Sequence, residues 1–389
     1  MFIAEGRGWG PAIACALALF VGGSTPCKAQ VARSLSTDNP KITKADKAVG
    51  EAVSKFFSNS CHVGLSIAIV KGGQTTFYND GSTFRGKQKL ANADSMYEIA
   101  SVTKTFTGAL AADAVVEHRM KLDANFGEYL PQAYPNLAWQ GQPITLRTLA
   151  THRSGLPRDL PNTDDLYAHR NFDTFPDQLI ARETGYDRAR YLRELHSVHL
   201  NSLPGSSEAY SNLGIKVIGF GLEQVYGVPY ERLTVQKILR PLGMTSTGFV
   251  IGSAEQSHLV RGYDRSGKLM PYHLRNAGAA YGLYSTPRDM AKYLRWQLDE
   301  ANPVIRLAHQ PLRGNVEDGE GLIWSLAVDG ETRILWHGGG TFGMSSQIVL
   351  YPAAQEGFVL LANDTCEGTE GALKDIAMEV HRDLDAATK

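Results

Sequence analysis

Trp336-His-Gly-Gly-Gly-Thr-Phe-Gly343 is a glycine-rich stretch that begins at the end of one strand-like run, 332–336, and precedes another, 346–351. It contains the pattern Gly-x-Gly-x-x-Gly, which binds dinucleotides where a strand precedes it and a helix follows. Here the run Ser346-Gln-Ile-Val-Leu-Tyr351 follows, and it predicts a strand. The pattern therefore does not indicate nucleotide binding. It predicts a strand end where a ligand can approach the backbone closely.

Further strand-like runs flank this stretch at 323–328 and 358–362. The connections between the late strands are short, which favours antiparallel pairing over a parallel crossover sheet. A helical pattern follows at about 369–383. The last hundred residues therefore predict an antiparallel sheet followed by a helix.

The chain after the predicted signal peptide begins with a helix and a hairpin. Residues 41–58 carry apolar side chains at helical spacing, and 64–70 with 74–79 predict a hairpin around Lys71-Gly-Gly73. A helix is expected from Ser101 to about residue 117.

The middle of the chain, about 120–280, is rich in loops, and its best helix candidates are 144–151 and 211–226. The predicted fold class is α/β, with an antiparallel sheet flanked by terminal helices and an inserted, mostly helical lobe. We expect one domain over 30–389. Its sheet lobe spans about 41–90 plus 281–389, and its helical lobe spans about 91–280.

Residues 1–29 have the layout of a secretory signal peptide, with Arg7, an apolar run over 11–21 and a small residue, Ala29, before the cleavage point. The run is shorter than the roughly 20 residues that span a bilayer. An uncleaved anchor is the alternative, because Glu5 weakens the positive start. We therefore expect a periplasmic or secreted protein with no membrane span after cleavage.

The charge of the chain is balanced, with 39 Lys and Arg against 40 Asp and Glu. Because no basic stripe is present, nucleic acid is not expected as a partner. Signal cleavage would leave two of the four cysteines, Cys61 and Cys366. In an exported protein they form either a bridge or two buried free thiols.

Ser101-Val-Thr-Lys104 is the only Ser-x-x-Lys in the chain. A spacing of three residues on a helix places the hydroxyl and the amine on one face. A serine becomes a nucleophile when a neighbouring group removes its proton, and an amine can do so if its pKa is lowered. A helix start also offers free backbone N–H groups where negative charge develops. The pair indicates a catalytic dyad or, alternatively, an exposed Ser and Lys.

Tyr210-Ser-Asn212 is the second candidate element. A phenol can shuttle a proton, and an amide can orient a carbonyl or an amine. Tyr134-Pro-Asn136 has the same spacing but lies in a loop interrupted by proline, and it ranks second. His196-Ser-Val-His199 has a spacing that permits metal binding, but no third ligand cluster accompanies it, so neither a metal nor another cofactor is expected.

The order Ser-x-x-Lys, Tyr-x-Asn and His-Gly-Gly resembles the penicillin-recognising serine hydrolases, and within them the class C β-lactamase and D-alanyl-D-alanine peptidase branch. Three more segments are similar to that family: Leu149-Ala-Thr-His-Arg-Ser-Gly-Leu-Pro157, Pro241-Leu-Gly-Met244 and Gly282-Leu-Tyr-Ser-Thr-Pro-Arg-Asp-Met290. The resemblance spans about residues 43–380. It implies a β-lactamase/transpeptidase-like fold.

The resemblance also implies roles for individual residues. Ser101 would be the nucleophile, Lys104 its activator and Tyr210 a proton relay, and which of the last two is the acylation base stays open. The remaining implied roles are substrate binding by Asn212, His337, Gly338 and Gly339, an oxyanion hole formed by the backbone N–H groups of Ser101 and Gly340, and a Cys61–Cys366 disulfide joining the first and last strands of the sheet.

Two residues depart from the family pattern. His337 stands where the family commonly has a lysine, and an imidazole near pKa 6.5 is only partly charged at neutral pH. Arg153 stands where a small residue is usual. The histidine favours a peptidase, amidase or esterase over an efficient β-lactamase.

The sequence therefore predicts an exported serine hydrolase that acts through an acyl-enzyme. The expected substrate is a D-Ala-D-Ala-type peptide of peptidoglycan, with β-lactams as acylating ligands. Three alternatives remain: a class C-like β-lactamase, an esterase or amidase of the same family, and a non-catalytic penicillin-binding sensor.

Overall fold

The structure is a computed structural model that describes residues 35–385, apart from 172, 254 and 274–277. The predicted signal peptide, 1–29, lies outside the described residues. Leu35–Lys389 forms one compact unit.

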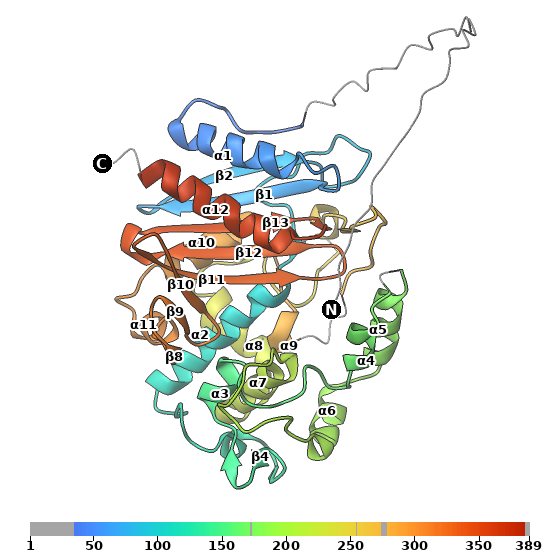
Figure 1. Cartoon of the computed structure of the whole chain (residues 1–389), viewed down its shortest axis with the longest axis vertical. Helices are drawn as coiled ribbons and strands as arrows, with labels where there is room; N and C mark the ends of the chain where they lie inside the picture. The colour runs from blue at the N-terminus through green and yellow to red at the C-terminus, as the bar shows by residue number, and fades with distance from the viewer. Residues whose placement is uncertain (1–34, 172, 254, 274–277, 386–389) are drawn as a thin grey trace, which may run out of the picture. The chain divides into compact units, whose positions relative to one another are not determined.

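An eight-stranded antiparallel sheet organises this unit, with the strand order β2-β1-β13-β12-β11-β10-β9-β8. Strand β1 pairs with β13 in a register that places Leu65 opposite Ala362, so strands from early and late in the described chain lie side by side near the β2 edge of the sheet (Figure 1). The strands are β1 Gly64–Lys71, β2 Gln74–Gly81, β8 Arg313–Gly314, β9 Asp318–Glu320, β10 Ser325–Asp329, β11 Thr332–Gly340, β12 Ser345–Tyr351 and β13 Glu356–Ala362.

Two terminal helices, α1 (Lys44–Phe56) and α12 (Thr369–Asp385), pack on each other and cover one face of the sheet (Figure 1). Thr43 begins α1 with a capping box to Asp46. Helices α2 and α10 lie on the other side, where α10 contacts β1 and β13. Because both faces are covered, every residue of β12 and β13 is buried.

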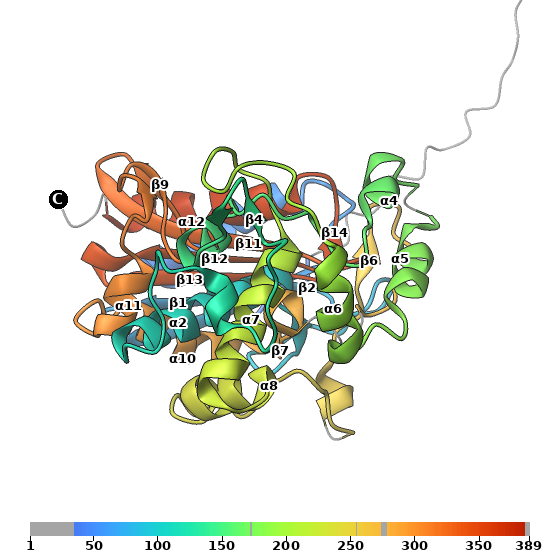
Figure 2. The same cartoon turned by 90° about the horizontal axis from the view of Figure 1, so that it is seen from below.

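The segment between β2 and β8 is mostly helical and begins with β3 (Tyr97–Glu98) and a 3₁₀ turn, η1 (Ala100–Val102). Helix α2 (Thr103–Val116) then runs through the interior and is buried on nearly all sides. The other helices are α3 Leu146–Ala150, α4 Asp164–Ala168, α5 Phe175–Glu183, α6 Arg188–Glu194, α7 Asn212–Tyr226, α8 Tyr230–Thr234, α9 Gly278–Tyr281, α10 Pro287–Gln297 and α11 Pro303–Ala308 (Figure 2).

Short elements complete the described chain. The small strands are β4 Ala138–Trp139, β5 Gln142–Pro143, β6 Tyr263–Asp264, β7 Tyr284–Ser285 and β14 Asp364–Thr365. The short helical turns are η2 Phe126–Tyr129, η3 Leu195–Ser197, η4 Val235–Leu239, η5 Glu255–His258 and η7 Pro352–Ala354.

The predicted fold class is confirmed, because the described sheet is antiparallel and the terminal helices flank it. The predicted end of the strand at 332–336 was wrong. The predicted strand at 332–336 continues to Gly340, so the glycines of the opening stretch belong to β11 itself. They pair with Ser345, Ser346 and Gln347 of β12.

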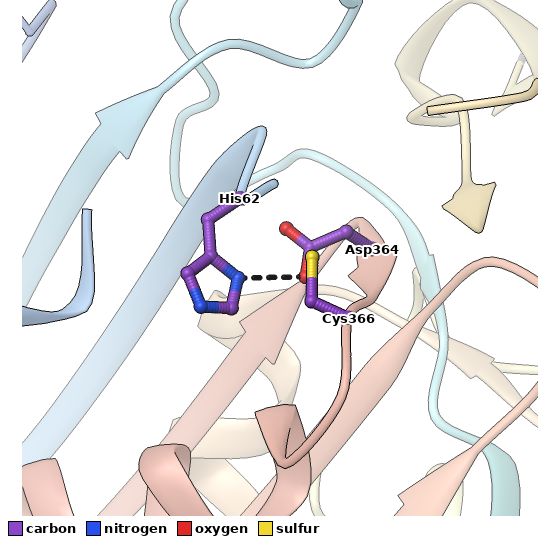
Figure 3. A group of neighbouring side chains, drawn as sticks. All are labelled: His62, Asp364 and Cys366. Carbon is purple, nitrogen blue, oxygen red and sulfur yellow. Dashed lines mark hydrogen bonds and ion pairs between the residues drawn. The ribbon is translucent and has the colours of Figure 1, made fainter. Parts of the chain in front are cut away.

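Cys61 and Cys366 are joined as a disulfide between the start of β1 and the end of β13, as the family resemblance implied. Next to it, His62 Nδ1 lies 2.9 Å from Asp364 Oδ1 (Figure 3). His62, Asp364 and Cys366 are residue types that bind metals. The sulfur of Cys366 is engaged in the disulfide, and Asp364 also accepts from the backbone N–H of Val63. This group therefore links the strands structurally.

No helix among the described residues is long and apolar enough to cross a membrane.

Candidate active site

Ser101 lies in the 3₁₀ turn that leads from β3 into α2. The preceding residue, Ala100, has φ of 48°, a left-handed conformation that is strained for a residue with a side chain. Ile99 and Val102 are buried on either side of this turn. The core therefore holds the turn in place and presents the Ser101 hydroxyl at the wall of a cavity.

Lys104 is one turn further along α2, at a position that is fully buried. Its Nζ lies 2.9 Å from Ser101 Oγ and donates to the backbone carbonyl of Ala280 at 2.7 Å. Burial holds the pKa of the Lys104 amine well below its usual value, because desolvation penalises the ammonium form. An amine in this state can accept the proton of the adjacent hydroxyl.

Tyr210 approaches the same hydroxyl from the other side, with its OH 2.7 Å from Ser101 Oγ. Burial raises the pKa of the Tyr210 phenol, while the hydrogen bond from Ser101 and the charge of Arg158 act in the opposite direction. The phenol therefore keeps its proton at neutral pH. Its ring packs at 4.4 Å from the ring of His152, whose Nδ1 accepts from the N–H of Ser211.

Asn212 is the first residue of α7, where the Ser211 side chain caps the helix by accepting from Gly214 N–H. Its Nδ2 donates to Asp159 Oδ1 at 3.0 Å, and its Oδ1 is buried without a hydrogen-bond partner among the described residues. That oxygen is available to a substrate N–H.

The competing Tyr-x-Asn pair is structural. Tyr134 OH donates to the carbonyl of Leu192, and Asn136 Nδ2 donates to the carbonyls of Leu195 and Val198. His196, in the candidate metal pair, stacks on Tyr134, and neither it nor His199 belongs to a group of metal-type ligands among the described residues.

The end of β11 forms the opposite wall. A Cβ on Gly339 would lie 2.6 Å from the backbone N of Ser101, so only glycine lets the strand pack this closely against the turn that carries Ser101. Ser346 Oγ reinforces the contact by donating to the carbonyl of Ile99. Cβ atoms on Gly338 and Gly340 would crowd the Glu370 carboxylate. The glycines thus serve the protein's own packing as well as ligand access.

His337 is not the partly charged group that its ordinary pKa suggested. Burial, with a contribution from Lys104, lowers the pKa of His337 to about 4. Its Nδ1 donates to the carbonyl of Gly338 at 2.7 Å, which leaves Nε2 as an acceptor. At neutral pH this wall therefore offers a neutral imidazole.

Glu98 connects the turn after β11 to the segment that contains Ser101. It lies three residues before Ser101, accepts from Thr341 Oγ1 at 2.9 Å and accepts from the backbone N–H of His273 at 2.5 Å. Burial raises the pKa of Glu98 to about 7. Because Thr341 follows Gly340, this carboxyl group fixes the two candidate oxyanion donors relative to each other.

Arg153 now has a structural explanation. It is buried, and its guanidinium lies 3.2 Å from Glu208 and 3.3 Å from Glu320. The pairs connect the loop before Tyr210 to β9 at the rim of the cavity. Arg153 thus forms ion pairs with two carboxylates that line the site.

The three sequence elements meet around one cavity of about 500 Å³, with Lys104 directly behind Ser101. The predicted residues that line it are Ser101, Tyr210, Asn212, His337, Gly338, Gly339 and Gly340.

The sequence did not single out several other residues that belong to this site. Arg158 and Glu370 line the cavity, and the Ala280 carbonyl orients Lys104. Arg158 directly follows the family-like segment that ends at Pro157, and this adjacency was the one available signal. Glu370 resembles an ordinary acidic residue in the first turn of a helix, and a backbone carbonyl has no sequence signature.

Comparison with solved structures shows the same fold. A class C β-lactamase superposes with a TM-score of 0.72 at 19% sequence identity, covering 87% of this chain and 96% of that one. A class C β-lactamase in complex with cefoxitin gives a TM-score of 0.71 at 20% identity, covering 87% and 98%. The fold is therefore that of the class C β-lactamases.

The β-lactamase family model matches residues 52–381, and the chain belongs to that family. D-alanyl-D-alanine-carboxypeptidase/endopeptidase AmpH of Escherichia coli (strain K12) is 31% identical over 254 residues, which cover 65% of this chain and 62% of AmpH. Protein flp of Staphylococcus aureus (strain MRSA252) is 27% identical over 312 residues, which cover 77% and 59%. The chain thus matches less than two thirds of the length of either relative.

Proposed function

We propose that this protein is an exported serine hydrolase that cleaves D-Ala-D-Ala-type peptides through an acyl-enzyme on Ser101. The observation that carries the proposal is the position of Ser101 Oγ, 2.9 Å from Lys104 Nζ and 2.7 Å from Tyr210 OH. The similarity to AmpH, a D-alanyl-D-alanine carboxypeptidase/endopeptidase by name, supports the choice of substrate.

In the acylation step, neutral Lys104 accepts the proton of Ser101 as the oxygen attacks the scissile carbonyl. The lowered pKa of Lys104 favours this role, and the raised pKa of Tyr210 makes the phenol a proton donor rather than a base. Tyr210 then protonates the leaving amine. The Lys104 ammonium returns the proton it gained to the Tyr210 phenolate, so both groups end the step as they began.

The developing oxyanion would be held by the backbone N–H groups of Ser101 and Gly340. The close packing of Gly339 on Ser101 supports this pairing, because it brings the strand end against the helix start. Asn212 Oδ1 and His337 Nε2 are the acceptors available to substrate N–H groups, and Gly338 and Gly339 supply the adjacent strand edge.

Deacylation repeats the sequence with water as the nucleophile. Water gives its proton to Lys104, its oxygen forms the new bond to the acyl carbon, and the proton returns to Ser101 Oγ as the ester bond breaks. No other reactant is needed for the hydrolysis to balance.

A class C-like β-lactamase is the second candidate, and the superposition with a cefoxitin-bound class C enzyme supports β-lactams as acylating ligands. The neutral His337 argues against it, because this wall offers no fixed cation for a β-lactam carboxylate. An esterase or amidase, or a penicillin-binding sensor, would retain the same acylation site. Export is supported by the Cys61–Cys366 disulfide, since disulfides persist in oxidising compartments.

The test is release of D-alanine from an N-acetylated tripeptide ending in D-Ala-D-Ala, followed with D-amino acid oxidase. We expect release by the wild-type protein and none by Ser101→Ala. Hydrolysis of a simple ester without release of D-alanine would reject the peptidase assignment and favour the esterase. Equal release by both proteins would reject the site.

A further inference from the structure

A second lysine is buried behind the pair of Ser101 and Lys104. Lys216 lies one turn into α7, four residues after Asn212, and only 6% of it is exposed. Within the described chain it lines a separate cavity of about 270 Å³ rather than the Ser101 cavity. A buried ammonium is costly unless its partners compensate for the lost water. The acylation steps described above do not use this lysine.

Two phenols and two carboxylates surround Lys216. Its Nζ donates to Tyr191 OH at 2.5 Å and lies 3.5 Å from Tyr281 OH. Glu183 accepts from that same Tyr281 hydroxyl at 2.9 Å. Burial alone would lower the pKa of this amine, but Tyr191 and the charges of Asp159 and Glu183 outweigh burial and raise it. Lys216 is therefore an ammonium at neutral pH.

Lys216 and Lys104 lie over the same aromatic ring. Their Nζ atoms are 5.3 Å and 5.7 Å from the centre of the Tyr281 ring. Tyr281 belongs to α9, and the neighbouring carbonyl of Ala280 accepts from Lys104 Nζ. Because both amines are buried at this short range, the charge of one penalises the ammonium form of the other.

Four charged side chains set the balance around Lys104. Burial is the largest cause of the low pKa of Lys104, and the charge of Asp159 opposes it. The charges of Arg158 and Lys216 add to the lowering, and Glu370 opposes it. Of the two cations, Arg158 lines the Ser101 cavity and Lys216 does not. Lys216 can therefore act on Lys104 without contacting a substrate.

The other titratable groups near Lys104 are His152, Tyr210, His273, Tyr281 and His337. Burial lowers the pKa of each of these histidines and raises the pKa of each of these phenols. All five are therefore uncharged at neutral pH. Removal of the Lys216 charge would leave one cation against two carboxyl groups around Lys104.

We propose that Lys216 is a positioning residue for acylation, whose buried ammonium keeps Lys104 in the neutral form that accepts the proton of Ser101. A neighbouring cation favours the neutral form of a catalytic amine. The inference rests on the proposed function in one respect, because it takes Lys104 as the base of acylation. It does not depend on which acyl group is transferred.

The test is the pH dependence of kcat/KM for p-nitrophenyl acetate between about pH 5 and pH 9. The leaving group of this ester departs without a proton, so the acid limb of the profile reports the base and not the proton donor. The rate with Ser101→Ala is subtracted at each pH as background. Lys216→Met and Lys216→Gln remove the charge, and Lys216→Arg keeps it. Lys47→Met is the matched control, because Lys47 is an exposed lysine on α1, across the sheet from α2.

We expect the acid limb of both uncharged variants to move to higher pH by about one unit, which is the effect of one unit charge at short range in a protein interior. On the acid limb their kcat/KM should be about tenfold below that of the wild-type protein. At alkaline pH it should return to the wild-type value, since Lys104 is then neutral in every variant. Lys216→Arg and Lys47→Met should keep the wild-type limb.

An acid limb at the wild-type position in both uncharged variants would overturn the proposal. A kcat/KM that stays low at alkaline pH would also overturn it, because a structural defect lowers the rate at every pH. The position of the limb does not depend on the amount of active protein, so a partly unfolded preparation still gives a result. If both uncharged variants fail to fold while Lys216→Arg folds, the charge serves folding rather than Lys104, and the proposal is overturned.

The proposed function fails separately. If the limb shifts as expected but the wild-type protein releases no D-alanine, the peptidase assignment falls and the role of Lys216 stands. If D-alanine is released and the limb does not shift, the role of Lys216 falls and the peptidase assignment stands.

Discussion

The two walls of the cavity contribute different kinds of chemistry. The wall formed by η1, α2 and the loops before α7 carries a buried lysine, a protonated tyrosine and the guanidinium of Arg158, which pairs with Asp159. The wall formed by the end of β11 carries glycines and one neutral histidine. The helical wall therefore supplies proton transfer and charge, and the strand wall supplies backbone and shape.

This difference changes the interpretation of the His337-Gly-Gly339 motif. A lysine in the strand wall would place a fixed positive charge beside the nucleophile. Here the histidine is neutral and Glu370 lies nearby, and among the described residues that line the cavity the one arginine or lysine is Arg158, on the other wall. The comparison predicts that removing a functional group has large effects on the helical wall, whereas on the strand wall added bulk matters more than the loss of a functional group.

Lys104→Met should have the largest effect. The methionine fills the buried volume but cannot accept a proton from Ser101, and general-base assistance contributes about 10²- to 10⁴-fold to a rate. We expect kcat/KM on an ester substrate to fall by about 10³-fold, with an unchanged unfolding midpoint in urea. If kcat/KM falls by less than tenfold, Tyr210 is the base and the two groups exchange roles.

Gly339→Ala should have the next largest effect. The new methyl group would meet the backbone N of Ser101 at 2.6 Å and push the strand from the nucleophile turn. A displacement of about 1 Å at a reacting centre can cost about 10²-fold, and we expect kcat to fall by that factor.

Gly248→Ala is the matched control, because its Cβ would find its nearest neighbour at 3.9 Å and its φ is ordinary. It should leave kcat within about twofold. Full activity in Gly339→Ala would mean that the strand wall does not set the oxyanion geometry.

His337→Asn should have the smallest effect on activity and a clear effect on the pH dependence of stability. The folded-state pKa of about 4 lies below the unfolded value near 6.5, so the unfolded chain binds more protons in between. The wild-type protein therefore loses stability as pH falls from about 6.5 toward 4, at up to about 1.4 kcal/mol per pH unit. The variant lacks this loss.

Urea unfolding at pH 7.5 and pH 5 measures this pH-dependent change in the free energy of unfolding. Relative to wild type, the variant should gain about 2 kcal/mol of unfolding free energy on going to the lower pH. The pH profile of kcat/KM should be the same for the wild-type protein and for His337→Asn, with no decline near pH 6.5 that depends on His337. Such a decline would restore a charged His337 as the carboxylate ligand.

Much of the fold could be predicted because β1, β12 and β13 are largely apolar runs and short connections join them to their neighbours β2 and β11. The hairpin of β8 and β9 was missed, since Arg313–Gly314 and Asp318–Glu320 are short and polar and give no periodicity. Helix α10 was not assigned as a helix, although Thr286, Pro287 and Asp289 carry its start signal.

At the site, residue types and order pointed to Ser101, Lys104 and Tyr210, and the structure brings these side chains together. The predicted partial charge of His337 was wrong, because its pKa depends on burial, which no local sequence pattern reveals. Arg158 was missed for a related reason. Its position against the rings of Tyr167 and Tyr210 at the cavity wall is a property of the folded chain.

The most direct test of the central claim is the intact mass of the protein after mixing with benzylpenicillin, quenched in acid at a series of times. Because a β-lactam ring opens without losing an atom, acylation should add the full mass of the ligand to the wild-type protein, and peptide mapping should place it on Ser101. A lasting adduct agrees with a peptidase, and a transient one with ring-opened product agrees with a β-lactamase. No adduct and no product at any time, or the same adduct on Ser101→Ala, would contradict the account.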